Sequence, residues 1–152
     1  MYHLRRTQKI PITLDKAWDF FSKPDNLKLI TPTYMNFKIL SRSDAGDMYP
    51  GMIISYQLSP LFNLSVKWAT EITQAKEKTY FIDNQIKGPY KIWNHEHRFK
   101  SISDGIEMND ILYYDLPFGF LGKIANRIFV QKRVNDIFNY RAQKIQEIFG
   151  KV

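Results

Sequence analysis

The sequence contains no cysteine. This absence excludes disulfides, thiolate metal sites and cysteine nucleophiles, and it fits a reducing compartment. Long apolar runs are also missing. No stretch approaches membrane-spanning length, and the basic start at Met1–Arg6 is not followed by the apolar stretch of a signal peptide. We therefore expect a cytoplasmic protein that is not stably inserted in a membrane.

Glycine is scarce, with 7 residues in 152, and phosphate-binding loops, nucleophile elbows and dinucleotide fingerprints are missing. Basic residues outnumber acidic ones, for a formal net charge of +7. The lysines and arginines are scattered along the chain, without an arginine-rich arm or zinc-finger spacing. We therefore predict no nucleic-acid partner, and a solvated basic surface capable of transient contact with an anionic membrane or an acidic partner.

The length and composition predict a folded chain with one core. A chain of 152 residues falls in the usual range of a single domain, and a content of 44% hydrophobic and 15% aromatic residues is unlike that of a disordered chain. No internal repeat, low-complexity tract or linker divides the sequence. We expect one domain over residues 1–152.

At the start of the chain, the spacing of apolar residues changes from the two-residue period of a strand to the spacing of a helix. Residues Tyr2–Ile10 alternate between apolar and polar side chains, which predicts a half-buried strand that Pro11 ends. Thr13 precedes a segment from Leu14 to Phe21 in which apolar residues recur at helical spacing, so it is a candidate N-cap. A second short helical piece fits Asn26–Leu29.

Six further strands follow, separated by short links that contain turn residues. They are predicted at Met35–Leu40, Met52–Leu58, Leu64–Thr73, Thr79–Ile86, Tyr90–Phe99 and Ile106–Leu116. The turn residues lie at Asp44–Gly46, Gly88–Pro89 and Ser103–Gly105. Links this short predict an antiparallel meander.

Beyond Pro117–Gly119 an apolar stripe predicts a long amphipathic helix. The stripe consists of Leu121, Ile124, Ile128, Val134, Ile137, Phe138, Ile145, Ile148 and Phe149. This order of elements predicts an α+β fold with a seven-stranded antiparallel sheet and two short helices between its first two strands. The last helix must then cover one face of the curved sheet, with room for a cavity between them.

Several local motifs strengthen this prediction. They lie at Asn26–Leu27, Ile30–Pro32, Phe81–Gln85, Gly88–Phe99, Asp110 with Tyr113, Leu116–Gly122 and Ile137–Arg141. Together they resemble the SRPBCC superfamily of START-like proteins, which includes polyketide cyclases and pollen allergens, and in particular a bacterial ligand-binding branch sometimes labelled cell-division-inhibitor-like. The resemblance spans nearly the whole chain. It implies a helix-grip fold, in which the sheet wraps around the C-terminal helix.

The predicted strand Tyr90–Phe99 is the most informative polar segment, because it places Trp93, His95, His97 and Phe99 on one face. Side chains from other strands can converge with this face. The polar candidates are Asp110, Gln85 and Glu71. They fit a buried polar network that satisfies the imidazoles, contact with a ligand, or acid–base catalysis.

For the catalytic alternative, the candidate residues are His95, His97 and Asp110. Two histidines on one strand face with a carboxylate nearby can also bind zinc or iron. This spacing is common without a metal, so we predict no metal and no cofactor.

The candidate ligand-binding residues combine these polar groups with aromatic and helical ones. They are Glu71, Gln85, Trp93, His95, His97, Phe99, Tyr114, Phe118, Ile124 and Ile128. Phe118 lies in a glycine-containing turn suited either to the mouth of a pocket or to a tight strand-to-helix corner, and Ile124 and Ile128 either plug the sheet or form the cavity floor.

The sequence favours a non-enzymatic protein that binds a small hydrophobic molecule, such as a lipid, an isoprenoid or a polyketide, in this cavity. Two alternatives stay open. One is a cyclase, aromatase or hydrolase that uses His95 and His97 in acid–base chemistry. The other is an interaction protein whose basic surface docks on an anionic membrane or an acidic partner.

Overall fold

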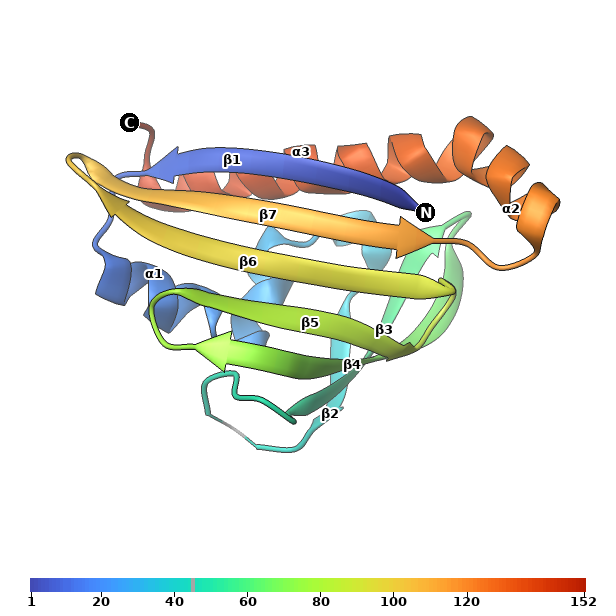
Figure 1. Ribbon diagram of the computed structural model, residues 1–152, viewed down its shortest axis with the longest axis horizontal. Coiled ribbons are helices and arrows are strands. Elements are labelled where there is room, and N and C mark those ends of the chain that lie inside the picture. Colours follow the sequence, from blue (N-terminus) through green and yellow to red (C-terminus); the bar gives the residue numbers. More distant parts are fainter. Residues whose placement is uncertain (45) are drawn as a thin grey trace.

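A computed structural model describes residues 1–44 and 46–152 (Figure 1). The strands are β1 (Tyr2–Ile10), β2 (Lys38–Arg42), β3 (Ile53–Leu61), β4 (Leu64–Lys76), β5 (Tyr80–Lys87), β6 (Ile92–Ile102) and β7 (Gly105–Asp115). The helical elements are α1 (Leu14–Phe21), η1 (Pro24–Ile30), η2 (Thr33–Met35), α2 (Gly119–Ala125), η3 (Asn126–Val130) and α3 (Gln131–Phe149). The predicted α+β fold is confirmed.

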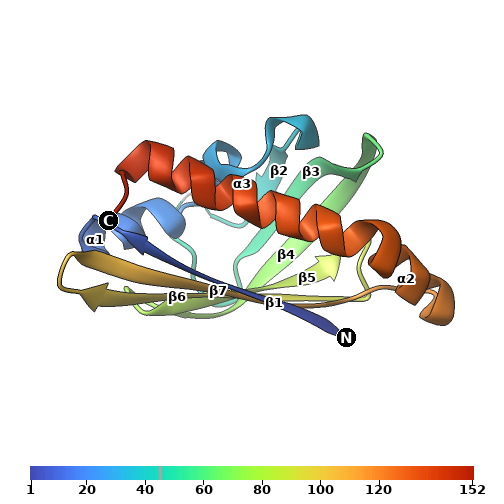
Figure 2. The same ribbon diagram turned by 90° about the horizontal axis from the view of Figure 1, so that it is seen from above.

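The seven strands form one antiparallel sheet in the order β1-β7-β6-β5-β4-β3-β2. Among the described residues, only the pairing of β1 with β7 joins strands that are distant in the sequence, and it extends from Tyr2 opposite Tyr114 to Ile10 opposite Ile106. Irregularities in register interrupt the pairing of β2 with β3, of β3 with β4 and of β4 with β5. Such irregularities bend and twist a sheet. The sheet curves, and α3 runs along its concave side (Figure 2).

The first helix begins where the sequence predicts. The side chain of Thr13 accepts a hydrogen bond from the backbone N–H of Lys16 at 3.2 Å, which caps α1. The apolar face of α1 buries Ala17, Trp18 and Phe21. This short helix therefore closes one end of the core.

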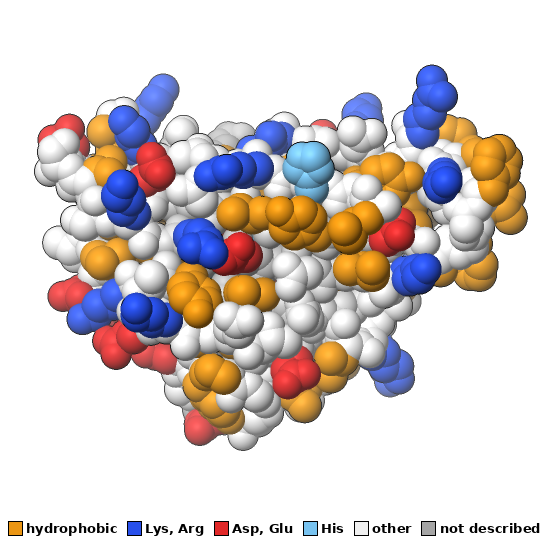
Figure 3. All heavy atoms as spheres, in the orientation of Figure 1, with side chains coloured by type: hydrophobic (Ala, Val, Ile, Leu, Met, Phe, Trp, Pro, Cys, Tyr) orange, Lys and Arg blue, Asp and Glu red, His pale blue; other side chains and the backbone are white. Residues whose placement is uncertain are grey.

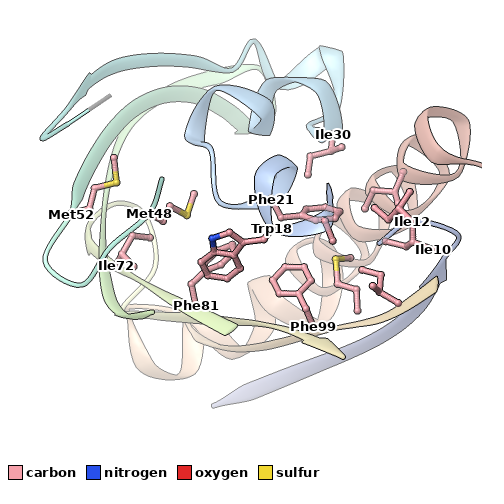
Figure 4. Close-up of a cluster of buried hydrophobic side chains, with 14 of the residues drawn as sticks. Ile10, Ile12, Trp18, Phe21, Ile30, Met48, Met52, Ile72, Phe81 and Phe99 are labelled. Carbon is pink, nitrogen blue, oxygen red and sulfur yellow. The ribbon is translucent and has the colours of Figure 1, made fainter. Parts of the chain in front are cut away.

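The largest core cluster lies beneath α1 (Figure 4). Trp18 makes edge-on contacts with Phe81 and Phe99, at centroid separations of 6.2 and 6.1 Å. Phe21 packs against Phe99 at 5.5 Å. Because Phe81 and Phe99 come from β5 and β6, these contacts fix the helix against the middle of the sheet.

The C-terminal helical region extends from Gly119 to Phe149, as predicted, but its buried face differs from the predicted stripe. The turn at Asn126–Val130 is π-helical, and its wider spacing shifts the phase of the faces relative to a regular α-helix. Val134 and Phe138 are buried, whereas Ile124 and Ile128 are 40% and 57% exposed. The predicted apolar stripe is therefore wrong in its first part.

Some strand boundaries also differ from those predicted from the sequence. The second strand begins at Lys38 because Met35 belongs to a 3₁₀ turn that ends at Asn36, whose backbone is left-handed with φ of 49°. The sixth strand begins at Ile92. The predicted turn at Asp44–Gly46 includes Ala45, which lies outside the described residues. Among the described residues, no helix is both long and apolar enough to cross a membrane.

Candidate functional site

A cavity of about 140 Å³ lies between the sheet and α3. Its wall contains a group of aromatic rings, namely Phe37, Tyr56, Trp68, Phe81, Tyr90, Trp93 and Phe138. The polar side chains on the wall are Thr31, Thr70, Asp83, His95, His97 and Arg141. The last four of these side chains are ionisable and belong to one cluster.

The cluster is built from three neighbouring strands. His95 and His97 are two residues apart on β6, so both side chains point to the concave face, where they are 5% and 2% exposed. In the strand register, His95 lies opposite Asp83 of β5, and His97 lies opposite Asp110 of β7. One carboxylate therefore lies on each side of the histidine pair.

A closed ring of contacts joins the two histidines to Asp83 and Asp110. Oδ1 of Asp110 lies 2.9 Å from Nδ1 of His97 and 3.1 Å from Nε2 of His95. Oδ2 of Asp83 lies 3.0 Å from Nε2 of His97 and 3.6 Å from Nδ1 of His95. The longest of these contacts, between His95 and Asp83, exceeds hydrogen-bond length.

This pattern assigns the protons. Burial and the proximity of His97 lower the pKa of His95, which favours a neutral ring that donates from Nε2 to Asp110. Burial opposes a charge on His97, but hydrogen bonds to Asp110 and Asp83 outweigh it and raise the pKa of His97. A protonated His97 donates to both carboxylates, and the unprotonated Nδ1 of His95 faces Asp83 across the longest contact.

Arg141 of α3 completes the balance of charge. Its Nη2 lies 3.9 Å from Oδ1 of Asp110. Burial alone would raise the pKa of Asp110, but Arg141 and the hydrogen bonds from both histidines hold it well below its usual range. With His97 protonated, two cations and two carboxylates make the cluster neutral, which is the state that burial favours.

Two aromatic rings hold the histidines in place. The ring of Phe81 stacks on that of His97, with centroids 4.2 Å apart and planes at 22°. Phe138 makes an edge-on contact with His95 at 5.2 Å. The imidazoles are also in contact with each other, with centroids 3.8 Å apart. Contacts on several sides leave little freedom for either ring to turn.

Two buried donors on residues of the cavity wall have no hydrogen-bond partner among the described residues. They are Nε1 of Trp68 and Nε of Arg141. By contrast, the hydroxyl of Tyr56 lies 2.7 Å from that of Thr70, and burial raises the pKa of Tyr56 far above its usual range. Buried donors are rarely left unpaired, so a group that enters the cavity can supply the missing acceptor.

The structure brings together part of the residue set expected from the sequence. His95, His97 and Trp93 line the cavity, and Asp110 lies directly behind the two histidines. Arg141 was not among the expected residues. It follows Phe138 by three positions, a spacing that places two helical residues on the same face, so the helical period could have identified it.

Other expected residues lie elsewhere. Glu71 does not line the cavity, because its neighbours Thr70 and Ile72 do and successive side chains of a strand alternate. Gln85 does not line it either, since its side chain donates to the carbonyl of Tyr90 at 2.6 Å and accepts from its N–H at 3.2 Å. Gln85 therefore closes the turn between β5 and β6.

The remaining expected residues also lie outside the cavity wall. Phe99 packs in the core beneath α1, and Tyr114 packs against Tyr2 with ring centroids 5.4 Å apart. Phe118 is 81% exposed, and the π-helical turn leaves Ile124 and Ile128 exposed.

Comparison with solved structures shows the fold alone. Protein CV1439 from Chromobacterium violaceum superimposes with a TM-score of 0.74 at 9% identity, with 100% of each chain covered. Protein Ms6760 from Mycobacterium smegmatis gives 0.69 at 15% identity, covering 96% of this chain and 89% of its own. Protein TTHA0849 from Thermus thermophilus gives 0.68 at 12% identity, covering 97% and 99%.

No family model matches the sequence, and no curated protein matches it. The solved structures are compatible with a helix-grip fold, a curved antiparallel sheet with a C-terminal helix. At these identities the likeness carries no activity from one protein to another.

Proposed function

We propose that the protein binds a small hydrophobic molecule that carries one polar group, in the cavity between the sheet and α3. The observation that supports this most directly is an aromatic wall with a cluster of ionisable side chains at one place on it. The apolar body of such a ligand would contact the rings, and its polar group would be oriented by His95, His97 and Arg141. The resemblance to the START-like SRPBCC superfamily points the same way.

The cavity volume narrows the class of ligand. A cavity of about 150 Å³ lined by apolar side chains accommodates benzene. The cavity in this protein has a volume of about 140 Å³, so a molecule with a single ring fits without rearrangement. A long acyl chain or a multi-ring polyketide would require the walls to move apart. We therefore favour a compact aromatic or cyclic ligand.

The polar group of the ligand is expected to accept hydrogen bonds. Both unpaired buried donors, at Trp68 and Arg141, belong to residues that line the cavity. A hydroxyl, carbonyl or carboxylate oxygen would satisfy at least one of them, and the desolvation cost of the donor would be recovered.

Two measurements test this proposal. Native mass spectrometry of freshly purified protein, followed by organic extraction, shows whether a molecule is carried from the cell. Titration with benzene, phenol and benzoate then compares one ring with no polar group, a neutral group and a charged group. We expect all three to bind, with phenol or benzoate tighter than benzene. Arg141→Met should remove most of that difference, while Tyr113→Phe, which is 42% exposed on β7, should not.

The proposal fails if none of the three rings binds to folded protein, or if they bind equally well to a variant in which the cavity is filled. Val134→Phe is suitable for this purpose, because Val134 lines the cavity and is 1% exposed. Overpacking of this kind costs about 1–3 kcal/mol of stability. Its unfolding curve must therefore be recorded alongside the titration.

Acid–base catalysis on the bound molecule is a second candidate, as in a cyclase or hydrolase. It is favoured by two imidazoles in contact on the cavity wall, with centroids 3.8 Å apart, whose pKa values are shifted in opposite directions by their surroundings. Such a pair can supply one proton donor and one acceptor. Hydrolysis of 4-nitrophenyl acetate is a first test. Turnover that survives in both His95→Gln and His97→Gln would exclude the histidines from the chemistry.

A further inference from the structure

The ring of contacts around the histidines has two unequal sides. Asp110 accepts from one nitrogen of each imidazole, at 2.9 and 3.1 Å. The other nitrogen of each imidazole faces Asp83, at 3.0 and 3.6 Å. Asp83, His95 and His97 line the cavity, whereas Asp110 does not. The side that holds Asp83 is therefore the one open to a small molecule.

We propose that Asp83, His95 and His97 form a binding site for one divalent first-row transition-metal ion, with Asp110 orienting both imidazoles from behind. The candidate ligand atoms of these three residues all lie within 4.8 Å of one another. Two imidazoles and a carboxylate suit Zn²⁺ or Fe²⁺. This departs from the expectation of no metal that the sequence alone supports.

The distances fit an ion between the three side chains. At metal–ligand bond lengths of 2.0–2.2 Å, two ligand atoms of a tetrahedral site lie about 3.3 Å apart. The separations of 3.0 and 3.6 Å between Asp83 and the facing nitrogens of His97 and His95 lie on either side of this value. The ion would take the place of the proton that His97 shares with Asp83.

Asp110 provides the support that metal-binding histidines usually have. In most such sites, the nitrogen that does not bind the metal donates to a carboxylate or a carbonyl, which fixes the ring orientation. Here a single oxygen of Asp110 receives both of these hydrogen bonds. The Asp110 side chain is 5% exposed, and Nη2 of Arg141 lies 3.9 Å from its Oδ1. The orienting group is therefore already in place before an ion binds.

Three protein ligands leave at least one coordination position open toward the cavity. Two carboxylates, Arg141 and a divalent ion would give the loaded site one net positive charge. An anionic or polar group on a cavity ligand could then bind the ion directly. Only this last step rests on the proposed function, because binding of the ion itself requires no organic ligand.

Metal binding is tested on the whole chain after treatment with a chelator, with no organic ligand present. Co²⁺ is added and visible absorption is followed, and Zn²⁺ binding is measured by calorimetry. We expect one ion per chain, visible bands from Co²⁺, and their loss when Zn²⁺ displaces it. Asp83→Asn and His97→Gln should abolish the bands. Asp110→Asn should weaken affinity about 10- to 100-fold and keep the stoichiometry.

The exposed histidine supplies the matched control. His3 lies on β1 and is exposed, so His3→Gln should bind both ions like the wild type. A measurement on the unmodified chain guards against variants that fail to fold. Zn²⁺ in excess should raise the Tm of the wild type and of His3→Gln by the same amount.

If the wild type shows neither visible Co²⁺ bands nor a rise in Tm with Zn²⁺, the metal site is refuted. A folded Asp83→Asn variant that binds the metal ions with wild-type affinity would also refute the site. Binding of benzene, phenol and benzoate to metal-free protein is a separate readout. If the rings bind and the ions do not, the proposed function stands without the metal.

A second surface carries an independent inference. Large apolar side chains project from α2, η3 and the turn between β3 and β4, with exposed fractions of 57% to 81%. The principal members of this apolar end are Phe62, Leu64, Phe118, Phe120, Leu121 and Ile128. The rings of Phe62 and Phe129, 5.5 Å apart, join the turn to the helix. Exposed apolar groups on this scale mark an interaction surface.

Positive charge accompanies the apolar end. Residues 116–135 contain two lysines and two arginines and no acidic residue. Figure 3 shows hydrophobic and basic side chains together over α2. Phe118 and Phe120 are 81% and 75% exposed. Projecting phenylalanines among lysines and arginines suit the interface of an anionic bilayer.

We infer that this apolar end docks reversibly on anionic lipid. Co-sedimentation with phosphatidylglycerol and with phosphatidylcholine vesicles tests it at low and high salt. We expect binding to phosphatidylglycerol that falls with salt and little binding to phosphatidylcholine. Phe118→Ser with Phe120→Ser, and separately Lys123→Glu with Arg127→Glu, should each abolish it. Leu29→Ser, which alters an exposed leucine on η1, should not.

Equal binding to both lipids, or binding unaffected by these variants, would overturn the inference. So would a dimer in sedimentation velocity that the phenylalanine variants dissociate, since the apolar end would then be covered by a second copy of the chain.

Discussion

Nδ1 of His97 lies 2.9 Å from Oδ1 of Asp110, and both side chains are at least 95% buried. This contact joins β6 to β7 within the sheet, and Arg141 adds α3 to the same group of charges. The cavity wall and the stability of the fold therefore depend on one set of ionisable side chains.

Removing the charge of Asp110 should destabilise the protein strongly. Asp110→Asn leaves Arg141 and His97 without their shared carboxylate, and breaking a buried pair costs about 3–5 kcal/mol. Guanidinium unfolding measures the loss. The matched control is Asp136→Asn, an exposed position on α3, which should change stability by less than about 0.5 kcal/mol. If Asp110→Asn also changed the free energy of unfolding by less than about 0.5 kcal/mol, the cluster would contribute no stability.

The metal-free protein should lose stability on both sides of neutral pH. Above about pH 6.5, unfolded histidine releases its proton while folded His97, whose pKa is raised, retains it. Its contribution is therefore complete below that pH and is lost as pH rises through the folded pKa. The charged groups around it are Asp83, Asp110 and Arg141, with His95 alongside.

Below neutral pH, the titrations of His95 and Asp110 both lower the free energy of unfolding as the pH falls. The lowered pKa of His95 means that unfolded chains take up a proton below about pH 6.5 that folded chains do not. The depressed pKa of Asp110 adds a further loss below about pH 4. Each proton contributes a slope of at most about 1.4 kcal/mol per pH unit. Unfolding free energies from pH 3 to 9 check this, and His97→Gln should lose the alkaline decline.

Enlarging the cavity should change the size of ligand that binds. Phe138 lines the cavity and is 5% exposed, so Phe138→Ala should admit a two-ring molecule such as naphthalene, which the wild type excludes. The truncation should cost about 3–5 kcal/mol. Phe120→Ala, at a position that is 75% exposed, serves as the control for both effects. Naphthalene binding to the wild type with equal affinity would show that the walls already move apart.

The turn into α2 should tolerate no side chain at Gly122. A Cβ atom there would lie 2.2 Å from the carbonyl oxygen of Pro117, so the backbone must shift. We expect Gly122→Ala to cost about 1–3 kcal/mol in thermal or denaturant unfolding. Gly46→Ala meets no atom within 4 Å and should be close to neutral. Equal stability of the two variants would contradict the tight packing of this turn.

The sequence predicts the sheet better than it predicts the site. Alternation placed His95 and His97 on the same face of β6, because a two-residue period is unaffected by distant contacts, and the structure shows that this face is buried. It failed for Glu71 because the parity of one strand does not reveal which face is concave. It failed for Ile124 and Ile128 because a π-helical turn leaves no mark in hydrophobic periodicity.

The pairing partners of the histidines depend on register, which local sequence patterns do not determine. Asp83 lies opposite His95 in the pairing of β5 with β6, whose connecting turn is closed by Gln85. Arg141 joins them from a helix 44 residues further along the chain than His97. Convergence of this kind follows from tertiary packing, and local pattern carries little of it.

The pairing of β1 with β7 also has a consequence for biosynthesis. Tyr2 pairs with Tyr114, so β1 lacks its partner until 112 more residues have been made. At about 5–20 residues per second, translation leaves that strand edge open for about 6 to 22 seconds. Asp110 and then Arg141 are synthesised after both histidines. A nascent chain therefore displays its β1 edge and its half-assembled pocket at the same time, and unpaired strand edges and exposed apolar surface are what make folding intermediates prone to aggregate.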